Sequence, residues 1–238
     1  ELLREKGIRV PKFMAVHTIE DIKQSAEILN YPIMLKTCTG GYDGKGNALI
    51  RTEEEVEEKY HALGAGTLDL MVEAFVPFVK EVSVLACRGI DGQIMVYPVA
   101  ENLHKDSILD ETIVPAAISE ESRLKAVCIA HDVMDIFEGV GMFCTEMFIT
   151  ADGEVFLNEV APRPHNSGHY TIEGCLTSQF EQHIRAITGL PLGDVTLRSP
   201  VVMRNLLGEE GYDGPTHIVG INEAYRQDPC LKVHLYGK

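Results

Sequence analysis

Apolar residues recur at the three- to four-residue spacing of an amphipathic helix in three stretches of the chain. The predicted helices are 18–30, 119–138 and 177–188. Thr18 and Ser119 stand where a hydroxyl can cap two of them, and Gly139 and Gly189 follow the last turns of two. In the longest helix, the face predicted to be buried consists of Leu124, Val127, Cys128, His131 and Met134.

Short apolar runs between turn residues predict β-strands elsewhere. These strands are expected at 32–37, 47–51, 68–76, 81–88, 93–100, 141–150 and 155–160. Asp91-Gly92 and Asp152-Gly153 are typical of two-residue hairpin turns, which join strands in antiparallel pairs. Thr52 with Glu55 has the spacing of a capping box and predicts a short helix to about residue 63. Because strands outnumber helices and pair as hairpins, the predicted class is α+β with largely antiparallel sheets.

Composition and charge restrict the function classes. The 238 residues are 45% hydrophobic and 24% charged, which is typical of a globular protein. The net charge of −15 opposes binding to nucleic acid or an anionic membrane, and no apolar run approaches the roughly 18 residues of a membrane span. The six cysteines form no C-x-x-C pair, which favours free thiols in a reducing cytoplasm over disulfides or a zinc site. The first residue is not Met, and we expect the sequence to be part of a longer chain.

A glycine-rich segment between two predicted strands is the first candidate site. Glycine lets consecutive backbone N–H groups turn towards an anion, and Lys36 and Lys45 can reach phosphate oxygens as point charges. The spacing is not that of a Walker A motif, so we expect a mobile cover over phosphate groups. A flexible hairpin tip with solvated lysines is the alternative. The glycines concerned are Gly40, Gly41, Gly44 and Gly46.

Two carboxylates are predicted to face each other across the second hairpin. Counting outward from a two-residue turn centred on Asp152-Gly153 places Glu146 directly opposite Glu159. Facing side chains have Cβ atoms only about 5 Å apart, so two like charges there are destabilising without a cation between them. Hard oxygen ligands favour Mg²⁺, and Asn158 could add another oxygen. The alternative is a solvent-exposed pair in which each carboxylate is screened separately.

A dense polar segment follows directly, from Pro162 to His169. Its prolines restrict the backbone, and its Arg, His and Asn side chains can donate hydrogen bonds to a small oxyanion. The planar guanidinium of Arg163 fits a carboxylate or bicarbonate, and His165 is the second candidate ligand. A structural role, with the ring bonded to backbone, is the alternative and is expected for His169 sooner than for His165.

The segment 72–81 could hold a nucleotide base. Extended backbone beside apolar side chains offers N–H and C=O groups to an adenine edge, and a carboxylate such as Glu73 or Glu81 can bind a ribose diol. An ordinary strand–turn–strand explains these residues equally well. His104 could also face the nucleotide, although an isolated histidine is more often structural.

Together these residues resemble the ATP-grasp superfamily of ligases, in which a glycine-rich segment closes over ATP and two acidic residues on adjacent strands bind magnesium. Within it, the chain is similar to the family of PurK-type 5-(carboxyamino)imidazole ribonucleotide synthases from near residue 8 to residue 238. The motif at 161–169 is the most specific. The motifs that carry the similarity are Gly-Gly-Tyr-Asp-Gly-Lys-Gly (40–46), Tyr-Pro-Val-Ala-Glu-Asn-Leu-His (97–104), Ala-Pro-Arg-Pro-His-Asn-Ser-Gly-His (161–169) and Thr-Ser-Gln-Phe-Glu-Gln-His (177–183).

The resemblance implies an ATP- and Mg²⁺-dependent carboxylating ligase of purine biosynthesis. ATP would phosphorylate bicarbonate to carboxyphosphate, and 5-aminoimidazole ribonucleotide would be carboxylated, leaving N-carboxyaminoimidazole ribonucleotide, ADP and phosphate. Glu146 and Glu159 would hold Mg²⁺, Arg163 and His165 would hold bicarbonate or carboxyphosphate, and Lys238, with Tyr42 and Asp43, would meet the ribonucleotide. The residues expected to contact ATP are Lys36, Gly41, Tyr42, Asp43, Gly44, Lys45, Gly46, Asn47, Glu73, Ala74, Phe75, Val76, Glu81, His104, Asn158 and Glu159.

The resemblance also implies an ATP-grasp fold with two lobes and without the domain that usually precedes it. Residues 1–76 would form the small lobe with the glycine-rich segment, 77–199 the large lobe with the metal and bicarbonate site, and 200–238 the start of a truncated C-terminal sheet domain. The expected partners are small molecules, with no nucleic acid or membrane, and a homodimer is possible. The alternatives are a formate-dependent transformylase, a biotin carboxylase-like enzyme, or an ATP-binding module without turnover.

Overall fold

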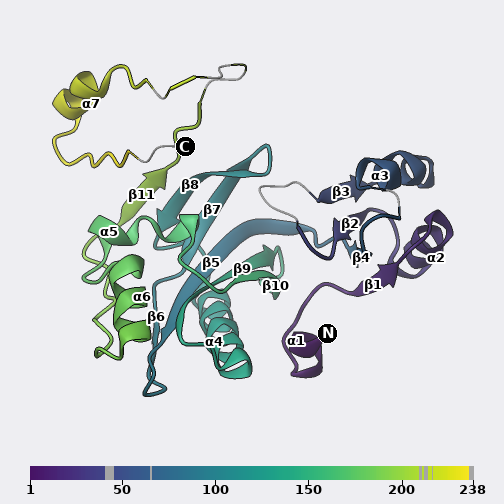
Figure 1. Cartoon of the computed structure of the whole chain (residues 1–238), viewed down its shortest axis with the longest axis horizontal. Coiled ribbons are helices and arrows are strands. Elements are labelled where there is room, and N and C mark those ends of the chain that lie inside the picture. The colour runs from purple at the N-terminus through teal and green to yellow at the C-terminus, as the bar shows by residue number, and fades with distance from the viewer. Residues whose placement is uncertain (41–45, 65, 209–210, 212–213, 216, 236–238) are drawn as a thin grey trace. The chain divides into compact units, whose positions relative to one another are not determined.

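The computed structural model describes residues 1–40, 46–64, 66–208, 211, 214–215 and 217–235. The chain forms two compact units, residues 1–204 and residues 205–238. The first unit holds two sheets with helices packed against them (Figure 1). Every pairing between the described strands is antiparallel, which confirms the predicted class.

The smaller sheet has four strands in the order β1-β4-β2-β3. Alternate residues of its strands, such as Leu35 and Val72, pack with α2 and α3 in one apolar core. Lys36 and Glu73 lie on the opposite face, because they alternate with those core residues. The elements are α1 (Leu2–Glu5), β1 (Phe13–Val16), α2 (Ile19–Leu29), β2 (Ile33–Thr37), β3 (Asn47–Ile50), η1 (Glu53–Glu55), α3 (Val56–Ala62) and β4 (Leu70–Ala74).

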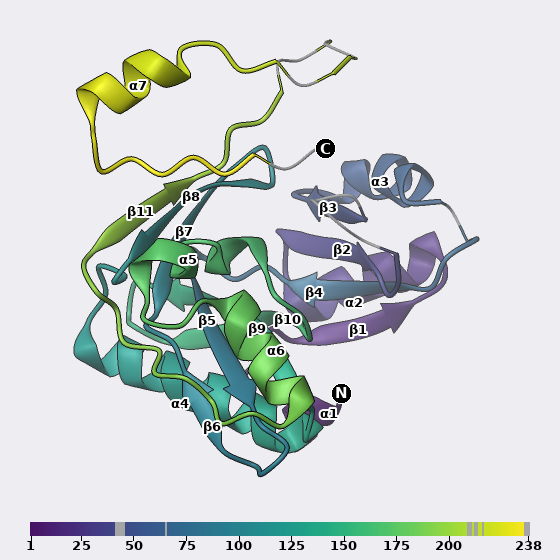
Figure 2. The same ribbon diagram turned by 60° about the vertical axis from the view of Figure 1, so that its left-hand side comes forward.

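The larger sheet has seven strands in the order β10-β9-β5-β7-β8-β11, with β6 also paired to β5. Helix α4 covers one face and α6 the other (Figures 1 and 2). Between them, residues of β5 and β9 alternate between the two apolar cores. The elements are β5 (Phe78–Arg88), β6 (Ile94–Val96), β7 (Ala100–Lys105), β8 (Ile108–Val114), α4 (Glu120–Phe137), β9 (Gly141–Thr150), β10 (Val155–Ala161), η2 (Asn166–Gly168), α5 (Thr171–Gly174), α6 (Gln179–Thr188) and β11 (Val201–Arg204).

One predicted strand is wrong, and one hairpin has no counterpart among the predictions. The expected strand at 93–100 is divided into β6 and β7, because Pro98 has no N–H to donate to a neighbouring strand. The hairpin of β7 and β8 was not predicted at all. Its turn residues, Asp106 and Ser107, have φ of 51° and 63°. Neither is glycine, so the usual sequence sign of such a turn is missing.

The buried face of α4 also differs from the prediction. Leu124, Cys128 and His131 are exposed, and of the predicted face only Met134 is fully buried. Small residues allow the helix to approach the sheet closely, and they take the positions in contact with it. The buried residues are Ser122, Ala126, Ala130, Val133 and Met134.

Helix capping follows the sequence at the starts of α2 and α4, whereas the left-handed residue that ends α4 is Glu138 (φ 51°) and not Gly139. Thr18 accepts the Asp21 N–H in a complete capping box, and Ser119 caps α4 by accepting the Ser122 N–H. The capping box predicted at Thr52 is wrong, because Thr52 makes no side-chain cap and Glu55 instead accepts the Arg51 N–H at 2.8 Å.

The second unit contains α7 (Ile221–Gln227). Strand β11 pairs with β8, so residues 201–204 extend the larger sheet. The expected three-part division at residues 76 and 199 stays a prediction. Among the described residues, no helix is both long and apolar enough to cross a membrane.

Candidate functional site

Glu146 on β9 and Glu159 on β10 are paired directly in the sheet register. Facing residues of antiparallel strands point to the same face. This face is shared with Cys144 and Ala161, which lie in the core beneath α6. The predicted juxtaposition of the two carboxylates is therefore confirmed, while their role as magnesium ligands stays a prediction.

The register arises differently from the prediction. The loop has three residues, 151–153, because Thr150 N–H bonds to the Glu154 carbonyl, and Gly153 takes a φ of 79°. The first pairs of this hairpin would place Asn158 opposite Glu146. A bulge at Asn158 shifts the register by one residue and brings Glu159 there instead. The two-residue turn was wrong, and the bulge compensates for it.

The opposed carboxylates are electrostatically strained in the chain alone. Burial raises the pKa of Glu146 to about 7, and the negative charge of Glu159 adds to the rise, while His104 opposes it. Ser83 pairs with Glu146 on the adjacent strand, and its buried hydroxyl has no hydrogen-bond partner among the described residues. A cation bound at the pair would relieve the repulsion.

Lys36 connects the smaller sheet to the bulge of the larger one. Its Nζ lies 2.5 Å from Glu73 Oε2 and donates to Asn158 Oδ1 at 3.2 Å. Both ends of this ion pair are mostly shielded from solvent, with 16% and 12% of the side chains exposed. This contact holds the positively charged Lys36 side chain beside Asn158, which precedes Glu159 in the sequence. Lys36 is the residue that the sequence predicted to bind phosphate.

Glu81 and His104 form a second polar pair on the same sheet. His104 Nδ1 lies 2.8 Å from Glu81 Oε2. This hydrogen bond raises the pKa of His104, and the negative charge of Glu146 adds to the rise. The histidine therefore lies within electrostatic reach of the carboxylate pair and has an ordered partner of its own.

Buried Gln179, on α6, fixes the backbone of His165 from both sides. The His165 N–H donates to Gln179 Oε1 at 2.9 Å, and Gln179 Nε2 donates to the His165 carbonyl at 2.7 Å. The same Nε2 lies 3.0 Å from His169 Nδ1. The His169 ring therefore contacts a side chain, whereas His165 Nδ1 accepts the backbone N–H of Ser167 at 3.4 Å, so the ring-to-backbone contact expected for His169 is found at His165.

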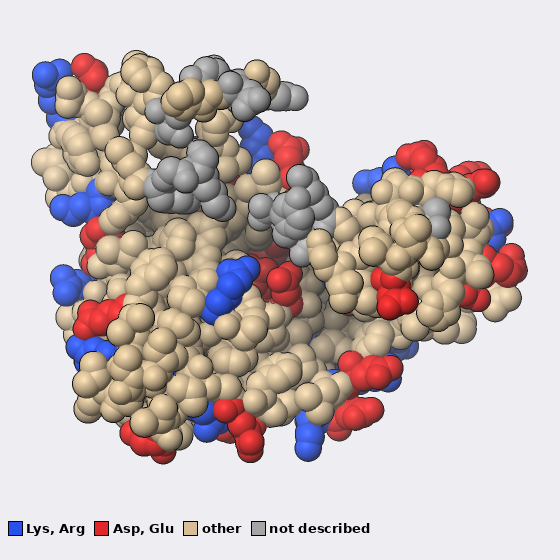
Figure 3. Space-filling view, viewed as in Figure 1, with Lys and Arg blue, Asp and Glu red and all other residues tan. Residues whose placement is uncertain are grey.

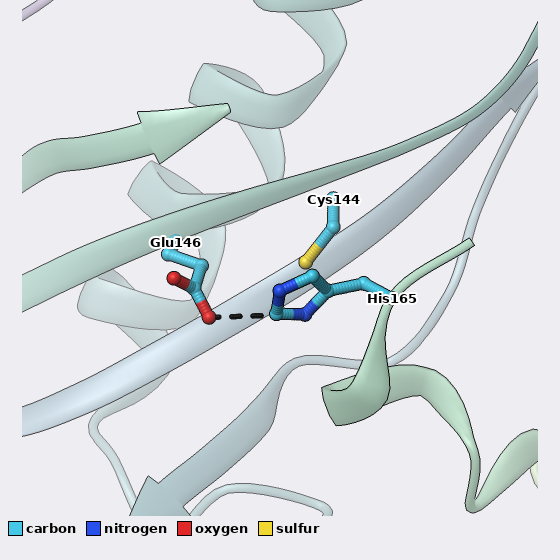
Figure 4. Close-up of side chains that lie close together, drawn as sticks. All are labelled: Cys144, Glu146 and His165. Atoms are coloured by element: carbon cyan, nitrogen blue, oxygen red, sulfur yellow. Dashed lines mark ion pairs between the residues drawn. The ribbon is translucent and has the colours of Figure 1, made fainter. Parts of the chain in front are cut away.

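The His165 ring lies in a small polar cluster with Cys144, Glu146 and Ser167. Ser167 Oγ is 2.9 Å from His165 Nδ1 and 3.4 Å from Cys144 Sγ, and His165 Nδ1 is 3.8 Å from Glu146 Oε1. The side chains of Cys144, Glu146 and His165 converge on one space (Figure 4). Burial raises the pKa of the Cys144 thiol well above its ordinary value.

The other predicted site residues are less tightly arranged. Arg163 donates to the Pro164 carbonyl at 3.0 Å and is exposed. Gly46 and Asn47 lie at the start of β3, Ala74 ends β4, and Phe75 and Val76 link β4 to β5. The remaining predicted site residues lie outside the described residues: Gly41, Tyr42, Asp43, Gly44, Lys45 and Lys238.

Sequence reasoning gave no role to Gln179, Ser167, Cys144 or Ser83. Gln179 stands within the quoted motif at 177–183, but an amphipathic pattern assigns a glutamine to solvent. A polar residue at an inward position of α6 was the one available signal. On the described part of the face in Figure 3, basic side chains are scattered among acidic ones.

The chain belongs to the ATP-grasp family, because the model of the ATP-grasp domain matches residues 1–180. Within that family it is similar to N5-carboxyaminoimidazole ribonucleotide synthases. It is 42% identical to the synthase of Bacillus subtilis (strain 168) over 99% of this chain. It is 39% identical to the phosphoribosylaminoimidazole carboxylase of Schizosaccharomyces pombe over 97% of this chain. The chain spans 60% and 42% of the lengths of these two relatives.

Solved structures show the same similarity. An ADP complex of purK, an N5-carboxyaminoimidazole ribonucleotide synthetase, superposes on this chain with a TM-score of 0.89 at 47% identity. The superposition covers 100% of this chain and 60% of the purK chain. The synthase of Aspergillus clavatus in complex with ADP and 5-aminoimidazole ribonucleotide gives a TM-score of 0.82 at 34% identity, over 88% of this chain and 55% of its own. The expected ATP-grasp fold is thereby confirmed.

The residues present fit a magnesium nucleotide. The facing carboxylates supply the hard oxygen ligands that Mg²⁺ prefers. Lys36 supplies a positive charge beside them for phosphate oxygens. Burial and the negative charge of Glu159 raise the pKa of Glu146, so a cation at the pair would favour its charged form.

Proposed function

We propose that this chain is the ATP-binding core of an enzyme that carboxylates 5-aminoimidazole ribonucleotide with bicarbonate, while ATP is converted to ADP and phosphate. The observation that supports this most is the facing pair of Glu146, which is largely shielded from solvent, and Glu159, which is exposed, beside Lys36. The similarity to synthases of this reaction over nearly the whole chain supports the choice of substrate.

The chain's own residues have distinct roles in this proposal. Glu146 and Glu159 hold Mg²⁺, and Lys36 binds phosphate oxygens after exchanging its contact with Glu73 or Asn158. When bound, the metal neutralises charge that develops on the transferring phosphoryl group. Phosphoryl transfer depends mostly on positioning and charge neutralisation, so ordered ligands on two sheets suit it.

The bicarbonate site lies on the segment that follows β10. Arg163 presents a guanidinium whose planar fork matches bicarbonate. His165 is directed by the Gln179 clamp and lies 3.8 Å from Glu146, so an anion held by it is next to the proposed metal. This arrangement brings the acceptor of the phosphoryl group close to the nucleotide.

The proposal extends to the expected surroundings of the enzyme. Its partners are the ribonucleotide, bicarbonate and ATP, and a cytoplasmic location and a possible homodimer belong to the same proposal. The residues that the sequence assigned to ATP, among them Glu73, Glu81 and His104, keep that role here.

Release of ADP tests the function. The chain is incubated with Mg-ATP and bicarbonate, with and without 5-aminoimidazole ribonucleotide. We expect ADP to appear faster when all three are present, and formate not to replace bicarbonate. Stimulation by formate would support a transformylase instead. ATP binding without ADP release under any condition would support a binding module.

Two variants separate the metal from the bicarbonate role. Glu159→Gln removes the charge of one proposed metal ligand and should abolish Mg-ATP binding or turnover. His165→Ala should preserve Mg-ATP affinity and lower bicarbonate-dependent ADP release. Near-normal ADP release by Glu159→Gln, or equal loss of nucleotide affinity in His165→Ala, would contradict these assignments.

A further inference from the structure

Cys144, Glu146 and His165 bring together the three donor types of a thiophilic metal site. The sulfur, a carboxylate oxygen and an imidazole nitrogen all lie within 4.8 Å of one another. Cys144 and Glu146 are alternate residues of β9 and therefore point to one face, and His165 reaches the same space from the segment before η2 (Figure 4). The cluster shares Glu146 with the proposed magnesium pair but does not include Glu159.

The ligand types select the metal. Thiolate, imidazole and carboxylate are the protein ligands of Zn²⁺, whereas Mg²⁺ does not take a thiolate in place of oxygen. We propose that Cys144, Glu146 and His165 form a binding site for Zn²⁺ or a cation of similar chemistry.

The geometry is close to that of an occupied site. Ligand atoms bound at about 2.0–2.3 Å in a tetrahedral site lie roughly 3.3–3.8 Å apart. His165 Nδ1 and Glu146 Oε1 are already 3.8 Å apart, and because all three ligand atoms lie within 4.8 Å of one another, side-chain shifts of at most about 1 Å bring them to these distances. Three protein ligands leave a fourth position for water or another small ligand.

The surroundings hold the ligands in place. Gln179 binds both the N–H and the carbonyl of His165, so the backbone that carries the imidazole is fixed. Ser167 Oγ contacts His165 Nδ1 and the Cys144 sulfur, so a metal bound at Nδ1 replaces the contact with the ring, and the hydroxyl can still hydrogen-bond to the sulfur. Such neighbouring hydrogen bonds orient metal ligands.

The cation can enter from the side of Glu146 and His165, whose side chains are 19% and 16% exposed, whereas Cys144 is buried behind them. On binding, the thiol proton is released to solvent and a sulfur–metal bond forms. If the proposed function holds, Zn²⁺ would withdraw Glu146 and His165 from magnesium and bicarbonate, and so inhibit the enzyme. The binding itself does not depend on that function.

Cobalt spectroscopy tests the site. The three exposed cysteines are first replaced by serine, because exposed thiols also bind metals; they are Cys38, Cys128 and Cys230. Titration of this chain with Co²⁺ should give a thiolate-to-cobalt charge-transfer band at one equivalent, and Zn²⁺ should abolish the band. Cys144→Ala should remove the band and weaken Zn²⁺ binding, measured against a chromophoric chelator, at least tenfold.

The matched control is Cys175→Ala, which removes another buried thiol and should leave the band and the affinity unchanged. Zinc-edge anomalous diffraction from crystals of the unmodified chain gives a test without substitution, and should place Zn²⁺ between the three ligands. Absence of the band, unchanged Zn²⁺ affinity in Cys144→Ala, or zinc density elsewhere would overturn the proposal and leave the cluster as a hydrogen-bonded network.

Discussion

Replacing Glu146 with glutamine should make the metal-free chain more stable at neutral and alkaline pH. The carboxylate is shielded from water and lies opposite Glu159, and its pKa is raised from 4.5 to about 7. An amide of the same shape carries no charge to desolvate and is not repelled by Glu159. Glu146, which is proposed to bind the metal, should therefore lower the stability of the metal-free chain.

The magnitude follows from the size of the shift. A rise from 4.5 to about 7 corresponds to about 3 kcal/mol between the two protonation states. Because the folded-state pKa is raised, the stabilisation by the proton is fully present below the unfolded value of 4.5 and is lost as the pH rises through about 7. The gain from Glu146→Gln should thus be under about 1 kcal/mol at pH 5 and about 2–3 kcal/mol at pH 8.

Urea unfolding in the presence of a chelator measures this difference at both pH values. The control is Glu57→Gln, which removes an exposed charge on α3 and should change the free energy of unfolding by less than about 0.5 kcal/mol at either pH. Adding Mg-ATP should reverse the order and favour the original chain. An equal gain at pH 5 and pH 8, or no gain at pH 8, would refute the electrostatic reasoning.

Three further predictions concern the neighbours of this pair. Glu81→Gln replaces the charged hydrogen-bond acceptor that raises the pKa of His104 with a neutral amide, so the pKa of His104 should fall in an NMR titration. The charged pair stabilises the fold below the unfolded pKa of 6.5, and this stabilisation is lost as the pH rises through the folded pKa. Lys36→Met should weaken Mg-ATP binding more than tenfold by calorimetry, and Lys36→Arg, which keeps the charge, should weaken it less. Gln179→Leu leaves the N–H and the carbonyl of His165 without their Gln179 partners, at a cost of about 1–3 kcal/mol each. This variant should lower bicarbonate-dependent ADP release, while its Mg-ATP affinity stays within about twofold of that of the original chain.

Each of these predictions has a result that would contradict it. An unchanged pKa of His104 in Glu81→Gln would mean that the hydrogen bond does not control its titration. Equal Mg-ATP affinities for Lys36→Met and the original chain would remove Lys36 from the nucleotide site. A parallel loss of nucleotide affinity in Gln179→Leu would show general unfolding of the site instead of a displaced His165.

The sequence predicted the elements well where their boundaries are set by local chemistry. Thr18 and Ser119 cap helices through their own hydroxyls, and Gly189 adopts the left-handed conformation that ends α6. These contacts form within a few residues, so the sequence specifies them directly. The hairpin of β7 and β8 was missed because Asp106 and Ser107 reach positive φ without glycine.

Helix faces were less predictable, because hydrophobicity does not measure how closely a helix approaches a sheet. In α4 the small Ala126 and Ala130 are buried, whereas the larger Leu124 is exposed. In α6 buried Gln179 and Gln182 bind the backbones of distant loops. Their inward direction depends on loops that adjoin the helix only in the folded chain.

The candidate site shows how two errors can cancel. A two-residue turn was predicted where three residues form the loop, and a bulge at Asn158 restores the pairing of Glu146 with Glu159. The bulge has no sign in the sequence. It also brings Asn158 to Lys36, a contact between the two sheets that no local pattern could predict.

The central claim is that Glu146 and Glu159 together bind the metal of a nucleotide. Crystals grown with ADP and Mn²⁺ in place of Mg²⁺ test it through the anomalous signal of manganese. We predict a manganese peak within about 2.3 Å of a carboxylate oxygen of each residue. Manganese bound beside ADP with neither carboxylate in coordination range would contradict the account.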